Sequence, residues 1–342
     1  MKAAMLFLLM VLFACSPDSA EIFMPVGDIR PPSLIRAGQS GPDAFDILFD
    51  EDIEPVAGSY AFLPAFTKAT PGAAGSLLTL SLEPAARAGE PCSLSGEVRD
   101  ASGNTTRFLF SFIGYNDSPA PLRLNEIQPG KNSSASNLHR DYIEFFVTKG
   151  GNLGGVQVQW ASSVKVMSWV FPPCDVMGGD VIVLHCAPEG SPGEVNETGS
   201  NLTISEGIDT SAAGRDFWTD SGGIPDETGL ILTRPREGDP PAECLFYASP
   251  SKEGAVDALK LRGLLEEAEC ESVWPSSSPP LWEEGFIWKS STSKPLHRKL
   301  EGEVGPDQWY VGDSGTQSPG IVSPANPSQG SKRVKKGAKQ AE

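Results

Sequence analysis

Glycine and proline occur so often in this sequence that few intervening segments are long enough for a helix of several turns. The 342 residues include 36 Gly and 30 Pro, and both residue types destabilise helix interiors. Frequent turns between short segments are typical of β-sheet proteins. The hydrophobic fraction of 39% is low but still sufficient for a core, and a chain of this length accommodates about two domains. We therefore expect an all-β protein of two domains.

The first expected domain covers residues 32–115. Short segments rich in β-forming residues predict its strands. The candidate strands are Ala44–Phe49, Leu77–Leu82, Cys92–Val98 and Phe108–Ile113. Asp100–Asn104 predicts a turn, because Asp and Asn bond their own backbone and Gly tolerates a positive φ. Strands at this spacing favour an antiparallel β-sandwich.

The second expected domain covers residues 121–322 and contains at least seven candidate strands. These are Leu122–Ile127, Asp141–Val147, Val156–Trp160, Val164–Val170, Asp180–His185, Gly229–Thr233 and Glu243–Tyr247. Because no regular helices separate them, they also predict an antiparallel sandwich.

Two insertions interrupt the second domain. Residues 189–216 are polar and rich in Gly, Ser, Asn and Thr, which predicts a long mobile loop. Residues 252–288 hold the one helical candidate, within Lys252–Cys270, and then a Trp-rich stretch. We expect the helix to pack on its own domain and the Trp rings to cap the sandwich. The alternatives are a partner-binding helix and exposed rings that stack on a sugar or contact a partner.

The order of motifs in the first domain resembles the bacterial Ig-like domains of exported proteins. The motifs are F-D-I-L-F-D-E-D-I at 45–53, L-T-L-S-L-E-P at 78–84 and V-R-D-A-S-G-N at 98–104. This resemblance implies a spacer or adhesion-type module without catalysis.

The second domain resembles the lamin-tail family through a longer series of ordered motifs. They are Asn125-Glu126-Ile127, Asp141–Phe146, Leu153-Gly154-Gly155, Gly178–Leu184, Gly229–Leu232 with Cys244–Tyr247, Leu296-His297-Arg298, Gln308-Trp309 and Ser318-Pro319-Gly320. The resemblance implies an Ig-like β-sandwich, with 189–216 and 252–288 as insertions.

The N-terminal residues have the pattern of an export signal. Residues 1–14 combine one Lys with an apolar run too short to span a bilayer as a helix. Leu12-Phe13-Ala14-Cys15 resembles a bacterial lipobox, which implies lipidation of Cys15 at the start of a linker over 15–31. Acyl chains would anchor the protein to a membrane surface. The alternative is an ordinary signal peptide with an incidental Cys.

Five further cysteines follow Cys15. They are Cys92, Cys174, Cys186, Cys244 and Cys270. An exported chain can keep disulfides, but an odd number leaves at least one thiol unpaired within the chain. Their spacing matches no zinc-binding pattern, and the pairing stays open. The alternative is that they are small buried hydrophobic residues.

No set of catalytic or metal-binding residues emerges from the sequence. It contains no nucleophile elbow, P-loop or paired-histidine zinc motif, and His139, His185 and His297 each stand alone. We expect His185 to be a satisfied core residue. We expect Glu126 and Glu144 to fix strand ends rather than to act as paired catalytic acids.

The acidic run Asp50–Glu54 could supply oxygen ligands to Ca²⁺, but it lacks a calcium-loop pattern and is interpreted as a solvated turn. We therefore expect no catalytic residues, no metal and no cofactor.

The charge distribution bears on partners. The net charge of −17 disfavours binding of the whole body to nucleic acid. Residues 323–342 form a basic tail that we expect to be disordered and solvated. The alternatives are contact with anionic lipid, peptidoglycan or nucleic acid.

These expectations describe a lipid-anchored, non-enzymatic binding or structural module of the bacterial cell envelope, at the outer membrane or periplasmic face. Its ligand would be an unknown protein or polysaccharide. The alternative function is an accessory or catalytic part of an exported metal-dependent hydrolase, similar to a nuclease or phosphodiesterase.

Overall fold

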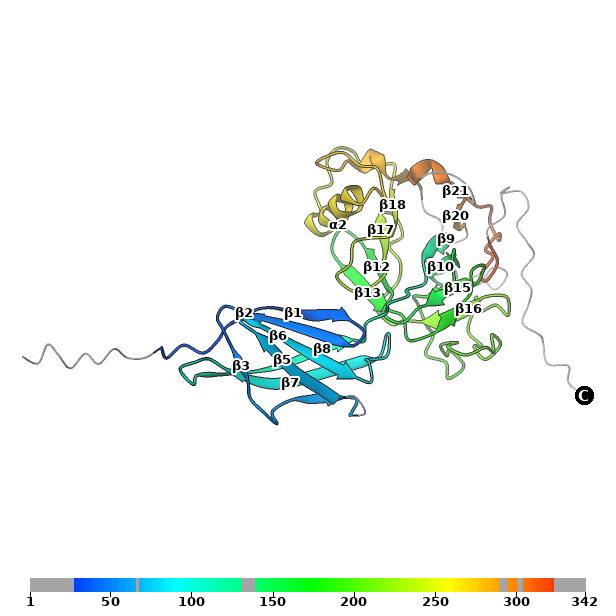
Figure 1. Cartoon of the computed structure of the whole chain (residues 1–342). Helices are drawn as coiled ribbons and strands as arrows, with labels where there is room; N and C mark the ends of the chain where they lie inside the picture. The colour runs from blue at the N-terminus through cyan, green and yellow to red at the C-terminus, as the bar shows by residue number, and fades with distance from the viewer. Residues whose placement is uncertain (1–27, 66–67, 131–138, 290–293, 300–303, 323–342) are drawn as a thin grey trace, which may run out of the picture. The chain divides into compact units, whose positions relative to one another are not determined.

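The computed structural model describes residues 28–65, 68–130, 139–289, 294–299 and 304–322 (Figure 1). The expected signal peptide, Cys15 and the basic tail lie outside these residues. Within them the chain is all-β apart from the helix α2 (Leu259–Cys270) and two short 3₁₀ turns, which confirms the expected class. None of the described helices is long and apolar enough to cross a membrane.

The chain divides into two compact units. One unit holds the described residues up to Ala85 together with Ser93–Ser111, and the other holds Ala86–Cys92 together with the described residues from Phe112 onward.

The first unit contains two antiparallel sheets. Its strands are β1 (Leu34–Gly41), β2 (Ala44–Phe49), β3 (Glu54–Pro55), β4 (Ala61–Leu63), β5 (Lys68–Ala74), β6 (Leu77–Glu83), β7 (Pro91–Arg99) and β8 (Thr105–Ile113). One sheet has the order β1-β2-β6-β5, and in the other β7 pairs with β3, β4 and β8. Alternate residues of β2 are buried, and Phe45 contacts Phe110 of β8 with ring centroids 5.5 Å apart. This contact joins the two sheets through an apolar core.

The second unit is built on a six-stranded and a five-stranded sheet. Its strands are β9 (Leu122–Gln128), β10 (Tyr142–Val147), β11 (Gly151–Asn152), β12 (Gln157–Ala161), β13 (Val166–Val170), β14 (Asp175–Val176), β15 (Val181–His185), β16 (Arg215–Trp218), β17 (Gly229–Arg234), β18 (Glu243–Ala248), β19 (Phe286–Ile287), β20 (Leu296–Arg298) and β21 (Trp309–Val311). The six-stranded sheet has the order β16-β15-β10-β9-β20-β21, and the five-stranded sheet has the order β13-β12-β17-β18-β19. Two pairs depart from the expected antiparallel pattern, because β15 and β16 run parallel, as do β18 and β19.

Aromatic rings join these two sheets. Phe171, which follows β13, packs edge-on against Phe217 of β16 with ring centroids 5.1 Å apart, and it also contacts Phe145 of β10. Edge-to-face pairs at such separations contribute beyond their area burial. The main hydrophobic core of this unit therefore lies between the two sheets.

The helix α2 packs on the second unit, as expected, with Leu261 and Leu265 fully buried in its core. Trp274, Trp282 and Trp288 are at most 3% exposed. These rings are part of the core, so the structure supports the capping interpretation over an exposed aromatic surface.

The expectation of a mobile loop over 189–216 is wrong. Glu197, Ser205 and Asp209 are completely buried in this segment. The polar residues of this segment form hydrogen bonds that hold the loop against the six-stranded sheet. A polar composition is the same for a loop bonded in this way and for a solvent-exposed loop, so it does not distinguish the two.

Candidate functional site

The strand register of the six-stranded sheet aligns four ionisable side chains. Glu144 of β10 lies opposite Glu126 of β9, and Glu126 lies opposite His297 of β20. In the other direction Glu144 lies opposite Val183, which lies opposite Asp216 of β16. Directly opposed residues share one face of a sheet. We call His297, Glu126, Glu144 and Asp216 the polar row.

The polar row occupies the sheet face that points away from the main core. Ile143 and Phe145, on either side of Glu144 in β10, belong to that core, and successive strand residues point to opposite faces. All four side chains of the row are nevertheless at most 2% exposed. The row therefore has a cover made by other parts of the chain.

One part of the cover is Gln317–Gly320, which we call the closing segment. The backbone N–H and the hydroxyl of Ser318 both donate to Glu126, the hydroxyl at 2.6 Å. The backbone N–H of Gly320 donates to Glu144 Oε2 at 2.6 Å. Tyr142 also donates to Glu126, and Asn125 donates to Glu144. Each buried carboxyl group thus has at least two donors, as buried polar groups require.

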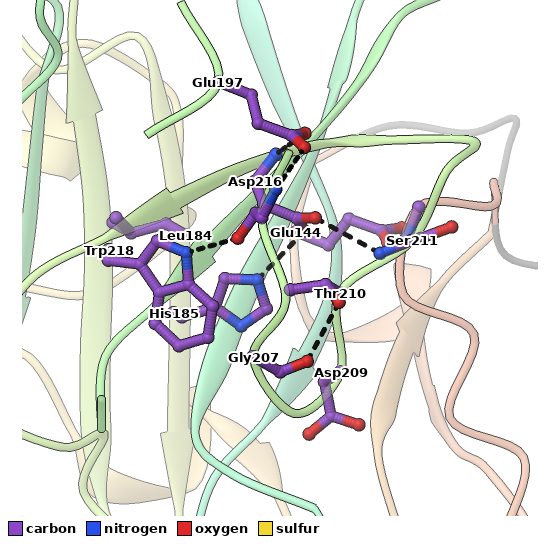
Figure 2. Close-up of polar contacts among 12 residues, drawn as sticks. Glu144, Leu184, His185, Glu197, Gly207, Asp209, Thr210, Ser211, Asp216 and Trp218 are labelled. Atoms are coloured by element: carbon purple, nitrogen blue, oxygen red, sulfur yellow. Dashed lines mark hydrogen bonds and ion pairs between the residues drawn. The ribbon is translucent and has the colours of Figure 1, made fainter. Parts of the chain in front are cut away.

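The other part of the cover is the loop before β16 (Figure 2). Ser211 donates its backbone N–H to Asp216 Oδ2 at 3.2 Å, and the backbone N–H of Asp216 donates to Glu197 Oε2 at 3.0 Å. His185 Nε2 lies 3.0 Å from Asp216 Oδ1, and the Trp218 ring stacks on the imidazole with centroids 4.0 Å apart. His185 is therefore buried, as expected from the sequence, but it is satisfied only in part, because its buried Nδ1 has no hydrogen-bond partner.

The expectation that the three histidines stand alone is wrong. His139 Nδ1 lies 2.7 Å from Asp209 Oδ1, and His297 Nδ1 lies 3.4 Å from Glu126 Oε2. With the contact between His185 and Asp216, each histidine meets a buried carboxyl group. These pairings join residues between 31 and about 170 positions apart, so they depend on tertiary structure that the sequence does not display.

The expectation that Glu126 and Glu144 fix strand ends is also wrong. Glu126 lies within β9 and Glu144 lies within β10, directly across from each other. A bulge displaces Asn125 from the register beside them, and its amide donates to Glu144. The signal that could have found the pair is an acid inside an apolar strand, because a buried charge requires a partner.

Burial sets the protonation of the row. Burial, and secondarily the charge of Glu126, raises the pKa of Glu144 well above its ordinary value of 4.5. Burial lowers the pKa of His297, and this outweighs the opposite effect of Glu126. Burial likewise raises the pKa of Tyr142 well above 10. These directions favour a protonated Glu144 carboxyl on one side of Glu126 and a neutral His297 imidazole on the other, which limits the charge held in the low-dielectric interior.

Access limits what the polar row does chemically. A hydrolase that uses paired carboxyl groups needs them in a cleft that the substrate enters. The closing segment and the loop before β16 instead contact the carboxyl groups of Glu126, Glu144 and Asp216 directly. Neither the groove beside α2 nor the shallow depression on β5 and β6 is lined by any residue of the row.

The other candidates from the sequence stay separate from the row. Cys92, Cys174, Cys186 and Cys244 are buried free thiols, and Cys270 is an exposed one. The four buried thiols agree with the interpretation of the cysteines as small buried hydrophobic residues, whereas the exposed Cys270 departs from it.

In the first unit, the acidic run contributes Glu51 to a cluster with Asp28 and Asp100, whose carboxylate oxygens lie within 4.8 Å of one another. Glu54 instead pairs with Arg99 at 2.9 Å. Asp100 accepts hydrogen bonds from the backbone and side chain of Asn104, so it serves the predicted turn.

Comparison with known proteins places the second unit in a described family. Residues 120–311 match the family model TP_1001_2nd, described as "protein second domain". A protein of Treponema pallidum (strain Nichols) that carries the name "Uncharacterized protein" is 26% identical over 175 residues, which is 50% of this chain. The match covers 43% of that relative, so the chain spans less than half of its length.

Proposed function

We infer that this chain, which belongs to the TP_1001_2nd family, is a non-enzymatic binding or structural module of the adhesion type. The observation that carries this proposal is the cover over the polar row. The acids and histidines best suited to chemistry are buried, and the chain's own backbone and hydroxyl groups supply their partners. Such networks hold a fold together and specify its geometry.

We further propose that both units are Ig-like β-sandwiches and that the second is of the lamin-tail type. The first unit supports this with two sheets joined by ring contacts across an apolar core. The second supports it with a core between its two large sheets. The lamin-tail motifs also acquire roles, because N-E-I contributes Glu126 and S-P-G contributes the donors that cover it.

The location that fits this function is the cell envelope, with the module tethered through acylated Cys15. The sequence supports this through the apolar run of residues 1–14 and the polar residues that follow Cys15. Mass spectrometry of the mature N-terminus tests it. We expect the chain to begin at Cys15 with added acyl mass, and an unmodified N-terminus at another residue would contradict the anchor.

The three contacts between histidines and acids favour a second candidate, the exported metal-dependent hydrolase. The decisive experiment is a phosphodiesterase assay on the purified full chain with Mg²⁺, Mn²⁺ or Zn²⁺, with and without a chelator. We expect no turnover above that of the buffer. Chelator-sensitive turnover that Glu126→Gln abolishes, while the exposed-surface control Glu253→Gln retains it, would refute the non-enzymatic function.

A further inference from the structure

A groove of about 800 Å³ lies in the second unit between α2 and the sheet strands β12 and β17. Gln157 and Gln159 of β12 line it, on the opposite face from the core residue Trp160. Leu264 of α2 and the loop residues Pro240 and Pro241 add apolar surface. We call this hollow the α2 groove.

Acidic side chains dominate the α2 groove. Its charged lining residues are Glu237, Asp239, Glu266, Glu267, Glu271 and Arg234. The single lining cation is already engaged, because Arg234 donates to Gln159 at 3.0 Å, to the backbone carbonyl of Asp239 at 2.7 Å and to Glu267. Its charge is therefore offset inside the lining.

Cations just outside the groove offset part of the remaining charge. Arg236 pairs with Asp239 at 2.8 Å, and Arg262 lies 3.8 Å from Glu266. Among the described residues, no cation lies within ion-pair distance of Glu237 or Glu271. Even after every observed pair is counted, the α2 groove keeps a surplus of negative charge that a basic ligand would complement.

The chain itself carries a segment of matching chemistry. Residues 332–339 read K-R-V-K-K-G-A-K, with five cations and no acid. We propose that Lys332–Lys339 of the same chain docks in the α2 groove, with its ammonium and guanidinium groups against the acids. The aliphatic stems of the lysines would lie on Leu264 and the two prolines, as long cationic side chains do on apolar surface.

The length of chain after Val322 permits this contact. An extended backbone spans about 33–36 Å over the ten steps from Val322 to Lys332 and about 56–61 Å over the seventeen steps to Lys339. A globular unit of about 210 residues has a radius of gyration near 17 Å. The basic block therefore reaches distant parts of its own unit, and the tether gives it a high effective concentration at the groove.

Docking has a regulatory consequence. A docked tail is withheld from anionic lipid, and a polyanion or raised salt releases it, because exposed ion pairs are screened by salt. This behaviour does not depend on whether Cys15 is acylated or on the ligand of the module.

Disulfide trapping tests the proposal, because Cys270 lies in the lining of the groove and is exposed. The full chain carrying Gly337→Cys is oxidised mildly in neutral detergent at low protein concentration, and the linked peptides are identified by mass spectrometry. We expect an intrachain disulfide between Cys270 and the G337C thiol. Its yield should fall at least about threefold at about 500 mM salt.

The matched control neutralises the groove in the same G337C chain through Glu237→Gln, Glu266→Gln and Glu271→Gln. Tryptophan fluorescence checks that the unit stays folded. We expect about the same threefold loss of trapping at low salt.

Three results would overturn the proposal. If the disulfide yield is the same with the native and the neutralised groove, the two thiols meet by random collision and not by docking. Disulfides only between two chains would assign the groove to a second copy. No disulfide at any salt, with cosedimentation on phosphatidylglycerol but not phosphatidylcholine vesicles, would assign the tail to a lipid surface.

Discussion

Replacing Glu144 with Gln tests whether the polar row holds a protonated carboxyl group. Glutamine has nearly the shape of a protonated glutamic acid. Its carbonyl oxygen can accept from the N–H of Gly320, and its amide can donate to Asn125 once the Asn125 amide is turned over. We therefore expect Glu144→Gln to cost about 1 kcal/mol or less at pH 5, because the Gly320 N–H keeps its acceptor and the Asn125 amide is only reoriented.

The pH dependence of this variant gives the sharper prediction. Burial and the charge of Glu126 raise the pKa of Glu144 in the folded state, whereas the unfolded chain has the ordinary value near 4.5. The unfolded state therefore loses its proton first as pH rises. The contribution of Glu144 to the free energy of unfolding is therefore most favourable below pH 4.5. It declines as pH rises, until the pKa of Glu144 in the folded state is passed.

The size of this effect follows from linkage. While the folded Glu144 keeps its proton, raising the pH from 5 to 6 lowers the wild-type free energy of unfolding by about 1.2 kcal/mol relative to Glu144→Gln. Urea unfolding followed by tryptophan fluorescence measures it, because all seven Trp lie in the second unit. The exposed Glu253→Gln variant provides the control, with no such divergence expected.

A difference in the free energy of unfolding that changes with pH in the opposite direction would refute this account of the row. If the wild type gains stability relative to Glu144→Gln as pH rises, Glu144 is ionised in the folded protein. A difference that stays constant from pH 5 to 6 would show that folding leaves its pKa unchanged.

Three further measurements probe the cover and the cysteines. Gly320→Ala should destabilise the second unit by about 3 kcal/mol, because Gly320 has φ +82° and a Cβ there would lie 2.8 Å from the Gly214 nitrogen. Gly179→Ala is the control, since Gly179 also has a positive φ but has open space around it. It should cost only about 1 kcal/mol in the same urea assay. Ser318→Ala should cost about 1–2 kcal/mol, since its hydroxyl donates to a buried carboxylate, and an unchanged midpoint would argue against the cover. In a chain that carries Cys15→Ser, thiol titration without reductant should detect fast reaction at Cys270 in the native protein and five reactive thiols after unfolding. Fewer than five after unfolding would reveal a disulfide.

Local sequence pattern was sufficient for longer strands that bury one face, but it missed β1 and β5, whose residues are mostly exposed. Ala44–Phe49 was predicted to its exact bounds as β2, because its buried residues alternate. Val156–Trp160 differs from β12 by one residue at each end, and Val158 and Trp160 lie in the core as the alternation requires. A broad apolar face at helical spacing also predicted a helix within Lys252–Cys270, although α2 begins only at Leu259.

The candidate site depended on information that local pattern does not contain. β16, β20 and β21 have only three or four residues each, too few for a period to appear. Their places in the sheet come from pairing with distant strands. The contact between His297 and Glu126 exists only because β20 joins β9, and a shift of one residue would send Glu126 to the opposite face.

The closing segment also has a consequence for biosynthesis. Ser318 lies 192 residues after Glu126, and Gly320 lies 176 residues after Glu144. A growing chain therefore contains both acids long before it contains the donors that cover them. Any product that stops short of Ser318 would leave this pair open to water, so a premature stop near the C-terminus should expose the polypeptide to proteases even though nearly all of its strands have been made.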